Sequence, residues 1–295
     1  MKKIQGVIPP TLTTFDENGY FDPIRMRDFI QFLKPNVSGF FPCGTYGSGP
    51  MMDLSERKKV LETVISNSDA DHFVIAHIGS SNPAEVLSLA EHARSAGADA
   101  VATVIPYYYA VTFNMQNIKA FFQKLVEVAN IPVFIYNNPK TIGIPVTLEM
   151  LSELKSVGLA GIKDSSFDLL FFYACKYHLD LNEVKYIVGT EAFILPTVPL
   201  GAIGTIAGLA NAFPEYVMKL YRLTLEKKYD QAFEMQELVN NLREVQHLAQ
   251  SIPAIHAMLK LRSIDSGFPK FPYSLASDAV LIKMKEALIR LGVEL

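Results

Sequence analysis

Short apolar runs recur along the chain, and each has the length of a buried β-strand. They are rich in Val, Ile, Phe or Ala and are apolar throughout, which is typical of strands that are buried on both faces. The eight runs are Gly6–Pro9, Gly39–Cys43, Phe73–Ile78, Ala100–Ile105, Val133–Tyr136, Leu159–Lys163, Tyr186–Gly189 and Ala202–Ala207.

Longer segments between these runs carry apolar residues at the spacing of amphipathic helices. They are Ile24–Leu33, Leu54–Ser66, Pro83–Ala96, Met115–Ala129, Leu148–Lys155 and Leu169–Tyr177. Several follow capping residues, namely Asp53, Asn82 and Thr147, which accept hydrogen bonds from the first free amides of a helix. Strands that alternate with helices predict parallel strands joined by helical crossovers.

Eight such units favour a closed barrel, so we predict an α/β fold, a (β/α)8 TIM barrel, over residues 1–212. An open doubly wound sheet is the alternative that the periodicity leaves open. Strand-like runs stop after Asn211, and residues 213–295 predict a C-terminal helical extension packed on the barrel. Its expected helices are Pro214–Lys227, Tyr229–Gln250, Ala254–Arg262 and one near Ser277–Leu291.

Composition and charge narrow the possible functions. Of the 295 residues, 49% are hydrophobic and 19% charged, and the net charge of −3 offers no positive field for nucleic acid or an anionic membrane. No stretch approaches the ~18 apolar residues of a membrane span, and the opening MKKIQGVIPP is too soon broken by proline for a signal peptide. Cys43 and Cys175 lie in apolar stretches, which favours a reducing cytoplasm over disulfide bonds.

The stretch GIKDSS at residues 161–166 carries the most informative side chain. Lys163 ends an apolar run, so it is either an ion-paired or snorkelling group or an amine dry enough to lose its proton and attack a carbonyl. In a barrel, catalytic groups lie at the carboxyl ends of strands. The loops that would meet Lys163 there are Gly44–Gly49, Pro106–Tyr109, Tyr136–Pro139 and Gly189–Glu191.

These loops suggest roles, each with a structural alternative. Gly44–Gly49 could present backbone amides and the Thr45 hydroxyl to a carboxylate or phosphate, although a tight turn explains the glycines equally well. Tyr136 is either a core residue or part of a proton relay with Thr45 and the amine. Tyrosines 107–109 predict either an interface or a pocket wall.

The sequence gives little support to other site chemistries. The six histidines show no metal-ligand spacing, so we predict no metal site. Cys43 lacks an evident base and is expected to be a buried thiol. Whether His77 or Cys43 touches a substrate stays open.

Four motifs taken together resemble a known family. They are Gly44-Thr45-x-Gly47, Pro106-Tyr107-Tyr108, Tyr136-Asn137-x-Pro139 and Gly161-x-Lys163-Asp164. The set resembles the pyruvate-dependent class I aldolases, a superfamily that includes dihydrodipicolinate synthase, N-acetylneuraminate lyase and 2-keto-3-deoxygluconate aldolase. The resemblance covers nearly the whole chain and implies a (β/α)8 barrel, a small-molecule substrate and no cofactor. It also implies a homotetramer built as a dimer of dimers.

The resemblance implies a role for each matching residue. Lys163 would form an imine with pyruvate or another 2-keto acid, and Tyr136 would shuttle protons. Thr45 and the amide of Tyr46 would hold the pyruvate carboxylate, and Tyr108 would reach across a subunit interface to complete the relay. Other substrate-binding positions would be Gly44, Gly189, Ile206 and Thr141.

Departures from the synthase pattern bear on the second substrate. Dihydrodipicolinate synthase carries an arginine two places after the Tyr-Asn-x-Pro motif, where this chain has Thr141, and a second threonine where this chain has Tyr46. An acidic second substrate would therefore lose its counter-charge. Members of the group that accept a phosphorylated sugar acid carry an arginine just after the tyrosines, where this chain has Ala110 and Val111.

We therefore expect a lyase that cleaves an unphosphorylated 2-keto-3-deoxy sugar acid, of the 2-keto-3-deoxygluconate type, to pyruvate and an aldehyde such as glyceraldehyde. Gly44–Pro50, Pro106–Tyr109 and Phe268–Pro272 look more like those aldolases. The alternatives are condensation of pyruvate with aspartate semialdehyde, an N-acetylneuraminate lyase-like activity, or a keto-acid sensor without turnover.

Overall fold

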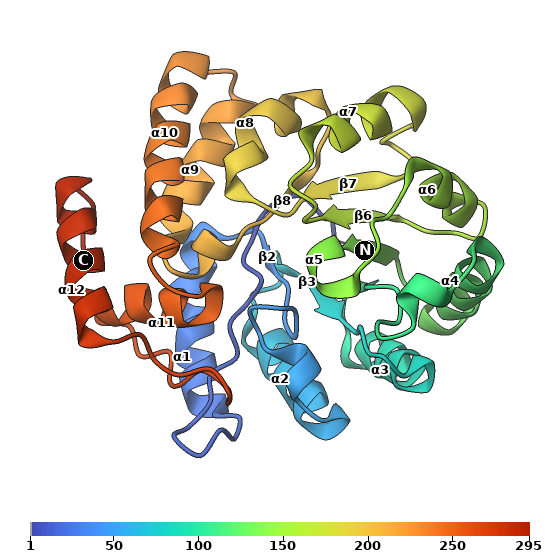
Figure 1. Ribbon diagram of the computed structural model, residues 1–295, viewed down its shortest axis with the longest axis horizontal. Coiled ribbons are helices and arrows are strands. Elements are labelled where there is room, and N and C mark those ends of the chain that lie inside the picture. Colours follow the sequence, from blue (N-terminus) through green and yellow to red (C-terminus); the bar gives the residue numbers. More distant parts are fainter. Residues whose placement is uncertain (1) are drawn as a thin grey trace.

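The computed structural model describes residues 2–295, in which eight parallel strands form one barrel inside a ring of helices (Figure 1). The strands are β1 (Gly6–Ile8), β2 (Gly39–Phe40), β3 (Phe73–His77), β4 (Ala100–Thr103), β5 (Val133–Asn137), β6 (Gly161–Asp164), β7 (Lys185–Val188) and β8 (Gly204–Ile206). The predicted (β/α)8 fold is confirmed. Within residues 2–295, no helix is long and apolar enough to cross a membrane.

The barrel closes between its first two strands. Hydrogen-bonded neighbours run from β1 through β8 and back down to β2. The amide of Ser38 then donates to the Val7 carbonyl at 2.8 Å, and that of Phe41 donates to the Pro9 carbonyl at 3.2 Å. These bonds satisfy the backbone groups that an open edge would expose.

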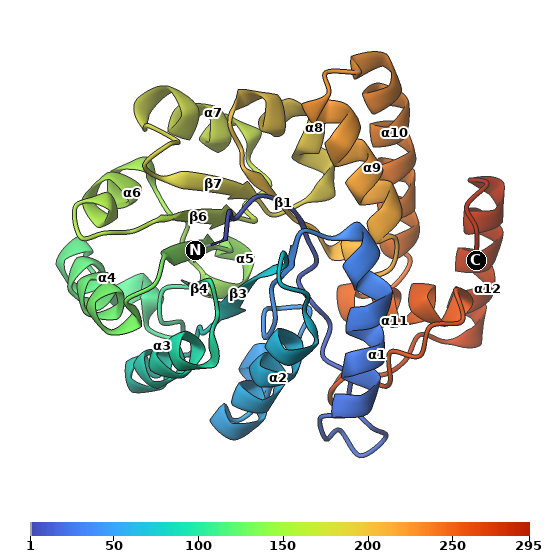
Figure 2. The same ribbon diagram turned by 180° about the vertical axis from the view of Figure 1, so that it is seen from behind.

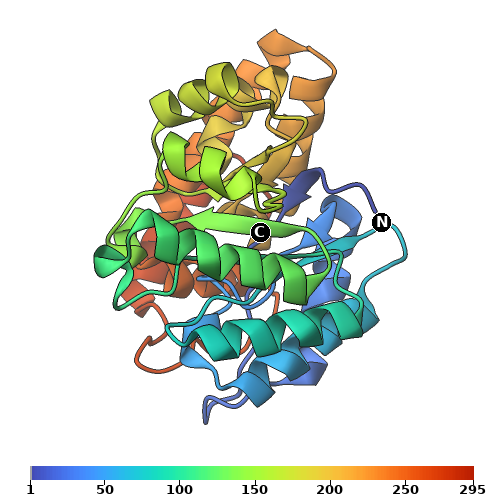
Figure 3. The ribbon, with the colours of Figure 1, turned by 90° about the vertical axis from the view of Figure 1, so that its right-hand side faces the viewer.

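Helices cover the outside of the barrel, as the turned views show (Figures 2 and 3). Those that follow the first six strands are α1 (Pro23–Leu33), α2 (Leu54–Asn67), α3 (Pro83–Ala96), α4 (Met115–Ala129), α6 (Leu148–Lys155) and α7 (Leu169–His178). Asp53, Asn82 and Thr147 cap their helices as predicted, each accepting a hydrogen bond from a first-turn amide.

The structure corrects several element boundaries. Strand β2 ends at Phe40 rather than Cys43, and Cys43 itself has a left-handed backbone with φ of 60° that no strand accommodates. Two short helices, α5 (Pro139–Ile142) and α8 (Ile194–Thr197), were not expected from the periodicity. Four-residue helices are too short for an amphipathic pattern to register.

The C-terminal region is helical, as expected. It contains α9 (Pro214–Leu225), α10 (Tyr229–Gln246), α11 (Ser251–Leu261) and α12 (Asp278–Arg290). Helix α10 ends four residues before the predicted Gln250, and α11 begins earlier, at Ser251, so that Pro253 lies in its first turn where no amide partner is lost. Figure 1 shows α9 and α10 side by side, with α12 outermost.

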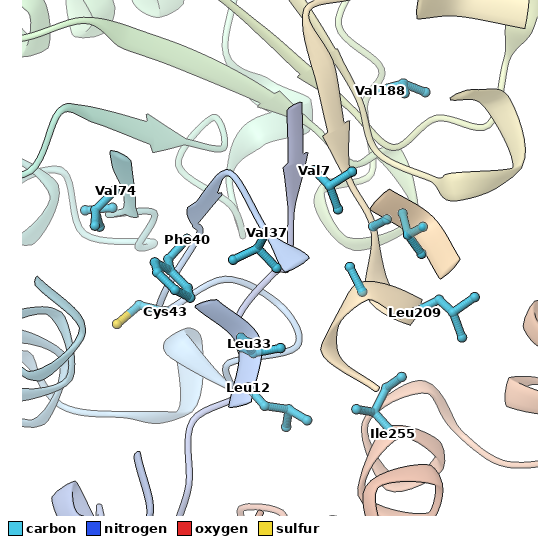
Figure 4. Close-up of a cluster of buried hydrophobic side chains, with 14 of the residues drawn as sticks. Val7, Leu12, Leu33, Val37, Phe40, Cys43, Val74, Val188, Leu209 and Ile255 are labelled. Atoms are coloured by element: carbon cyan, nitrogen blue, oxygen red, sulfur yellow. The ribbon is translucent and has the colours of Figure 1, made fainter. Parts of the chain in front are cut away.

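Successive side chains of each strand point alternately into the barrel and out toward the helices, so the hydrophobic core has two parts. Ile8, Phe134 and Ile187 point into the barrel and belong to one apolar cluster. Residues of the other parity, such as Val7 and Val188, pack outward against the helices in a second, larger cluster (Figure 4). Tyr136 and Lys163 share the parity of Phe134 and Ile187 and therefore face the barrel interior.

Candidate active site

Lys163 and Tyr136 lie directly opposite each other on β6 and β5. The Lys163 side chain is buried, with 3% of the residue exposed. Its Nζ lies 3.8 Å from the centre of the Tyr136 ring and 4.1 Å from that of Phe41. Within residues 2–295 it has no carboxylate partner. The strand register therefore produces a dry, unpaired amine beside a phenol.

The two side chains shift each other's pKa. Burial lowers the pKa of Lys163, because a charged amine loses its hydration, and Tyr136 opposes this only in part. Burial would raise the pKa of Tyr136, but the charge of Lys163 and the hydrogen bond with Thr45 bring it below its usual value. The lower lysine pKa favours the free amine. The lower phenol pKa depends on a charged Lys163, so it favours the passing of a proton between the two groups.

Thr45 and Asn138 hold the phenol from two loops. The Thr45 hydroxyl lies 3.3 Å from the Tyr136 hydroxyl, and the Asn138 side-chain amide donates to the same oxygen at 3.1 Å. The Tyr136–Thr45 contact is the one that the sequence analysis expected. Asn138 was missed, although it occupies the unspecified position of the Tyr-Asn-x-Pro motif.

One cavity of about 310 Å³ collects most of the expected residues. It is lined by Lys163, Tyr136, Thr45, Tyr46, Thr141, Gly189 and Ile206, together with Asn138, Ser165, Glu191, Arg243, Gln246 and further residues. The first seven come from the ends of five strands, or from the segments that follow them, at the carboxyl end of the barrel, where catalytic groups of this fold lie.

The loop after β2 offers unused donors to this cavity. Among the described residues, the backbone amides of Thr45 and Tyr46 donate to no protein acceptor. The Tyr46 hydroxyl accepts a hydrogen bond of 2.7 Å from Gln246, and burial raises the pKa of Tyr46 to about 12, so its ring is a fixed neutral wall. Two neighbouring free amides suit a carboxylate.

Gly189 keeps the floor of the cavity open. A Cβ there would lie 2.1 Å from the Ser165 hydroxyl and 2.5 Å from the Asp164 carbonyl. Its amide donates to that carbonyl at 2.6 Å. Only glycine fits this approach.

The outer part of the cavity is charged. The sequence analysis expected the loop of Glu191 at this mouth but did not anticipate Arg243 or Lys140. Glu191 is buried, which raises its pKa, and its carboxylate lies 3.4 Å from Arg243 Nε on α10. Arg243 and Lys140 both lie over the Phe167 ring, at 5.5 and 5.0 Å from its centre. Glu191 and Arg243 are far apart in sequence, and no local pattern links them.

Two expected residues lie outside this cavity. Gly44 packs on the Phe41 ring, where a Cβ would come within 2.7 Å, so it shapes the loop without lining the cavity. Tyr108 is 82% exposed, has an unusual φ of 80°, and lies against Tyr109 with ring centres 4.9 Å apart. Its role across a subunit interface stays a prediction.

His77 and Cys43 lie behind the phenol. The His77 ring stands edge-on to Tyr136 at 5.7 Å and its Nδ1 lies 2.9 Å from the Cys43 carbonyl. Burial lowers the pKa of His77 to about 3, so the ring is neutral. His77 lines a second cavity of about 240 Å³ that shares Thr45, Tyr136 and Thr141 with the first. Burial raises the pKa of Cys43 to about 11, which makes it an unreactive thiol.

Comparison with known proteins identifies the family. The profile described as the dihydrodipicolinate synthetase family matches residues 3–290. The chain belongs to the dihydrodipicolinate synthetase family. The resemblance that the four motifs carried is thereby confirmed for the chain as a whole.

The similar proteins carry the names of different enzymes. The chain is 30% identical over 295 residues to an uncharacterised DapA-like lyase of Halobacterium salinarum, covering 98% of this chain and 95% of that one. It is 27% identical to a 4-hydroxy-tetrahydrodipicolinate synthase of Methanothrix thermoacetophila, with 98% and 97% covered. A solved structure of KD(P)GA from T. tenax superimposes with a TM-score of 0.89 at 25% identity, with 98% and 99% covered.

Proposed function

We propose that this protein is a class I aldolase that reversibly cleaves a 2-keto-3-deoxy sugar acid to pyruvate and an aldehyde such as glyceraldehyde. The observation that supports the proposal most is the unpaired, buried amine of Lys163 beside the Tyr136 phenol. A structural lysine at this depth would have a carboxylate partner, because an isolated buried charge is costly. An amine that spends part of its time neutral avoids this cost and is a nucleophile.

The geometry supports imine formation at Lys163. The free amides of Thr45 and Tyr46 bind the carboxylate of the keto acid, which places its carbonyl carbon within reach of Lys163. The amine attacks that carbon, and a carbinolamine forms. Tyr136 then gives a proton to the carbinolamine hydroxyl, which leaves as water while the nitrogen lone pair forms the C=N bond.

Cleavage uses the imine as an electron sink. The phenolate left on Tyr136 takes the proton from the C4 hydroxyl, the C3–C4 bond breaks, and its electron pair moves into the imine to give an enamine. The C4 fragment leaves as an aldehyde. Protonation of the enamine carbon and hydrolysis of the imine release pyruvate and restore the Lys163 amine, so no redox partner is needed.

The outer cavity supports a polyhydroxylated second fragment. Glu191, Arg243 and Gln246 offer acceptors and donors that can bind several hydroxyl groups. Thr141 also lines the cavity and carries no charge. Of the two cations in the lining besides Lys163, Arg243 already faces the Glu191 carboxylate at 3.4 Å, which leaves Lys140 alone to balance a carboxylate of aspartate semialdehyde. These residues favour a sugar acid over an amino-acid semialdehyde.

We also propose a cytoplasmic homotetramer in which Tyr108 completes the relay of a neighbouring subunit. The exposure and the strained backbone of Tyr108 support this, since strain of this kind is retained where it serves a function. Mixing Lys163→Ala and Tyr108→Phe subunits tests it. Hybrid sites that combine an intact lysine with a neighbour's intact tyrosine should regain activity above that of either variant alone. No gain after subunit exchange would contradict the shared site.

The test of the aldolase is borohydride reduction in the presence of pyruvate, followed by peptide mass mapping. We expect one pyruvate adduct per chain, on Lys163, and turnover of 2-keto-3-deoxygluconate. An adduct on another lysine, or none, overturns the assignment of Lys163.

A second candidate is the synthase reaction, because the relative from Methanothrix thermoacetophila bears that name. It shares the Lys163 imine and differs in the second substrate. A competition assay with pyruvate, aspartate semialdehyde and glyceraldehyde separates the two. Faster consumption of the semialdehyde would establish the synthase and leave the imine chemistry intact.

A further inference from the structure

A second group of potential ligands lies at the opposite end of the barrel. Asp69, Asp71 and His72 form the turn between α2 and β3, at the amino ends of the strands. One nitrogen or oxygen from each residue lies within 4.8 Å of the others. The sequence analysis found no metal-ligand spacing among the six histidines. In the structure, however, two carboxylates lie beside one of them, His72.

Hydrogen bonding fixes the tautomer of His72. Its Nε2 lies 3.1 Å from the Lys34 carbonyl oxygen, which can only accept, so Nε2 carries a hydrogen. In the neutral ring, Nδ1 then carries a lone pair. The ring also packs against Phe40, with centres 5.5 Å apart, so it cannot turn freely. An Nε2–H bound to a carbonyl is the usual support for an imidazole that ligates a metal through its other nitrogen.

Nδ1 is buried and has no hydrogen-bond partner among residues 2–295. Only 8% of the His72 side chain is exposed. Two carboxylate oxygens lie close to it, Asp71 Oδ1 at 3.6 Å and Asp69 Oδ2 at 3.8 Å. These separations are too long for hydrogen bonds, and a lone pair that faces two anionic oxygens is repelled by them.

A cation between these three atoms removes the repulsion, and we propose that Asp69, Asp71 and His72 form a zinc-binding site. Two ligands that each lie about 2.1 Å from zinc in tetrahedral geometry are about 3.4 Å apart, close to the observed separations. Lys34 holds the other oxygen of Asp69 at 2.8 Å, which leaves Oδ2 turned toward His72. Water completes the coordination of a site with this exposure.

The ligand set selects the class of ion. One imidazole and two carboxylates suit zinc or a similar transition metal, whereas magnesium prefers oxygen ligands only. The site lies at the end of the barrel remote from Lys163, so zinc bound there acts on stability and leaves the reaction unchanged.

The experiment is calorimetric titration of the chelator-treated full chain with zinc alone and with magnesium alone. We expect one zinc per chain, a rise in melting temperature, and no magnesium binding at the same concentrations. Asp71→Asn should weaken zinc binding at least about tenfold without unfolding the protein, because Asp71 is 89% exposed. Asp28→Asn, which removes an exposed carboxylate paired with Arg27, is the matched control and should bind zinc like the wild type.

Two results would overturn the site. One is the absence of zinc binding, which would leave Asp69, Asp71 and His72 as side chains that merely adjoin one another in the turn. The other is equal zinc affinity in the Asp71→Asn and Asp28→Asn variants, which would place any bound zinc elsewhere on the chain.

Discussion

Lys163 and Asp164 are neighbours on β6, yet they occupy opposite environments. Lys163 faces the barrel interior, where aromatic rings and a phenol surround an unpaired amine. Asp164 faces outward, where its carboxylate accepts hydrogen bonds from Asn137 and Tyr186 at 2.6 Å each and from the Ser166 hydroxyl at 2.9 Å. A strand turns successive side chains to opposite faces, so two residues that could pair are kept apart.

The two environments suit the two residues to different roles, a chemical one for Lys163 and a structural one for Asp164. The carboxylate has several donors and no cation, and it holds the loop after β6 to its neighbouring strands. Among residues 2–295 the amine has no carboxylate partner to keep it charged, which favours its neutral form. If the two groups paired, the carboxylate would raise the pKa of the lysine and remove the nucleophile.

Removing the amine should give the largest effect. Lys163→Met keeps the length of the side chain and should abolish imine formation, lowering turnover at least about 10⁴-fold. Stability should stay equal or rise, because a buried polar head is replaced by an apolar one. Steady-state assays and urea denaturation measure both effects, with the exposed Lys155→Met as control. Residual turnover in Lys163→Met would show that another group is the nucleophile.

Removing the phenol oxygen should give the next largest effect. Tyr136→Phe should lower turnover about a hundredfold or more, because proton transfer to and from the substrate is lost while the amine remains. Borohydride trapping with pyruvate should still label Lys163, at a reduced rate. A Tyr136→Phe variant with the full rate would remove the phenol from the relay.

Changing the outward carboxylate should affect stability rather than chemistry. Asp164→Asn leaves buried donors on Tyr186 and Asn137 with a poorer acceptor, and we expect a loss of about 1.5–3 kcal/mol in the free energy of unfolding. Asp168→Asn, at the exposed cap of α7, serves as the control and should cost less. If Asp164→Asn abolished imine formation in the folded protein, the division between the two faces would be wrong.

The smallest effect concerns pH. Imine formation needs the free amine, so its rate should rise with pH through the pKa of Lys163 and then level off. Burial lowers that pKa and Tyr136 raises it again, so Tyr136→Phe should lower it further and move the rise to lower pH. The pH dependence of pyruvate trapping in both proteins measures this. A shift to higher pH would mean that the phenol does not stabilise the charged amine.

The sequence predicts the scaffold well because the scaffold is periodic. Eight apolar runs, separated by capped amphipathic helices, specify a barrel, and strand ends specify where its catalytic groups lie. Lys163 and Tyr136 come together because each ends one of these runs, on adjacent strands. Some predicted strand boundaries were wrong because the apolar pattern does not report the backbone conformation. Cys43, for example, has a left-handed backbone and lies outside β2.

The outer cavity could not be predicted in the same way. Arg243 lies within an ordinary amphipathic helix, and nothing near it in sequence shows that α10 passes over the cavity to meet Glu191. His72 presents the same difficulty, since its tautomer depends on a carbonyl of Lys34, which is distant along the chain. The Arg243–Glu191 and His72–Lys34 contacts both join residues that are distant along the chain, and patterns within a single sequence predict only local structure.

The position of α10 has a consequence for how this protein can diversify. The helix contributes Arg243 and Gln246 to the cavity, and His247 follows directly after its last residue. The rings that border the Lys163 amine, those of Phe41 and Tyr136, come from other elements. Under the proposed function, substitutions along α10 can therefore retune which aldehyde is accepted while the machinery that makes and breaks the carbon–carbon bond is inherited unaltered.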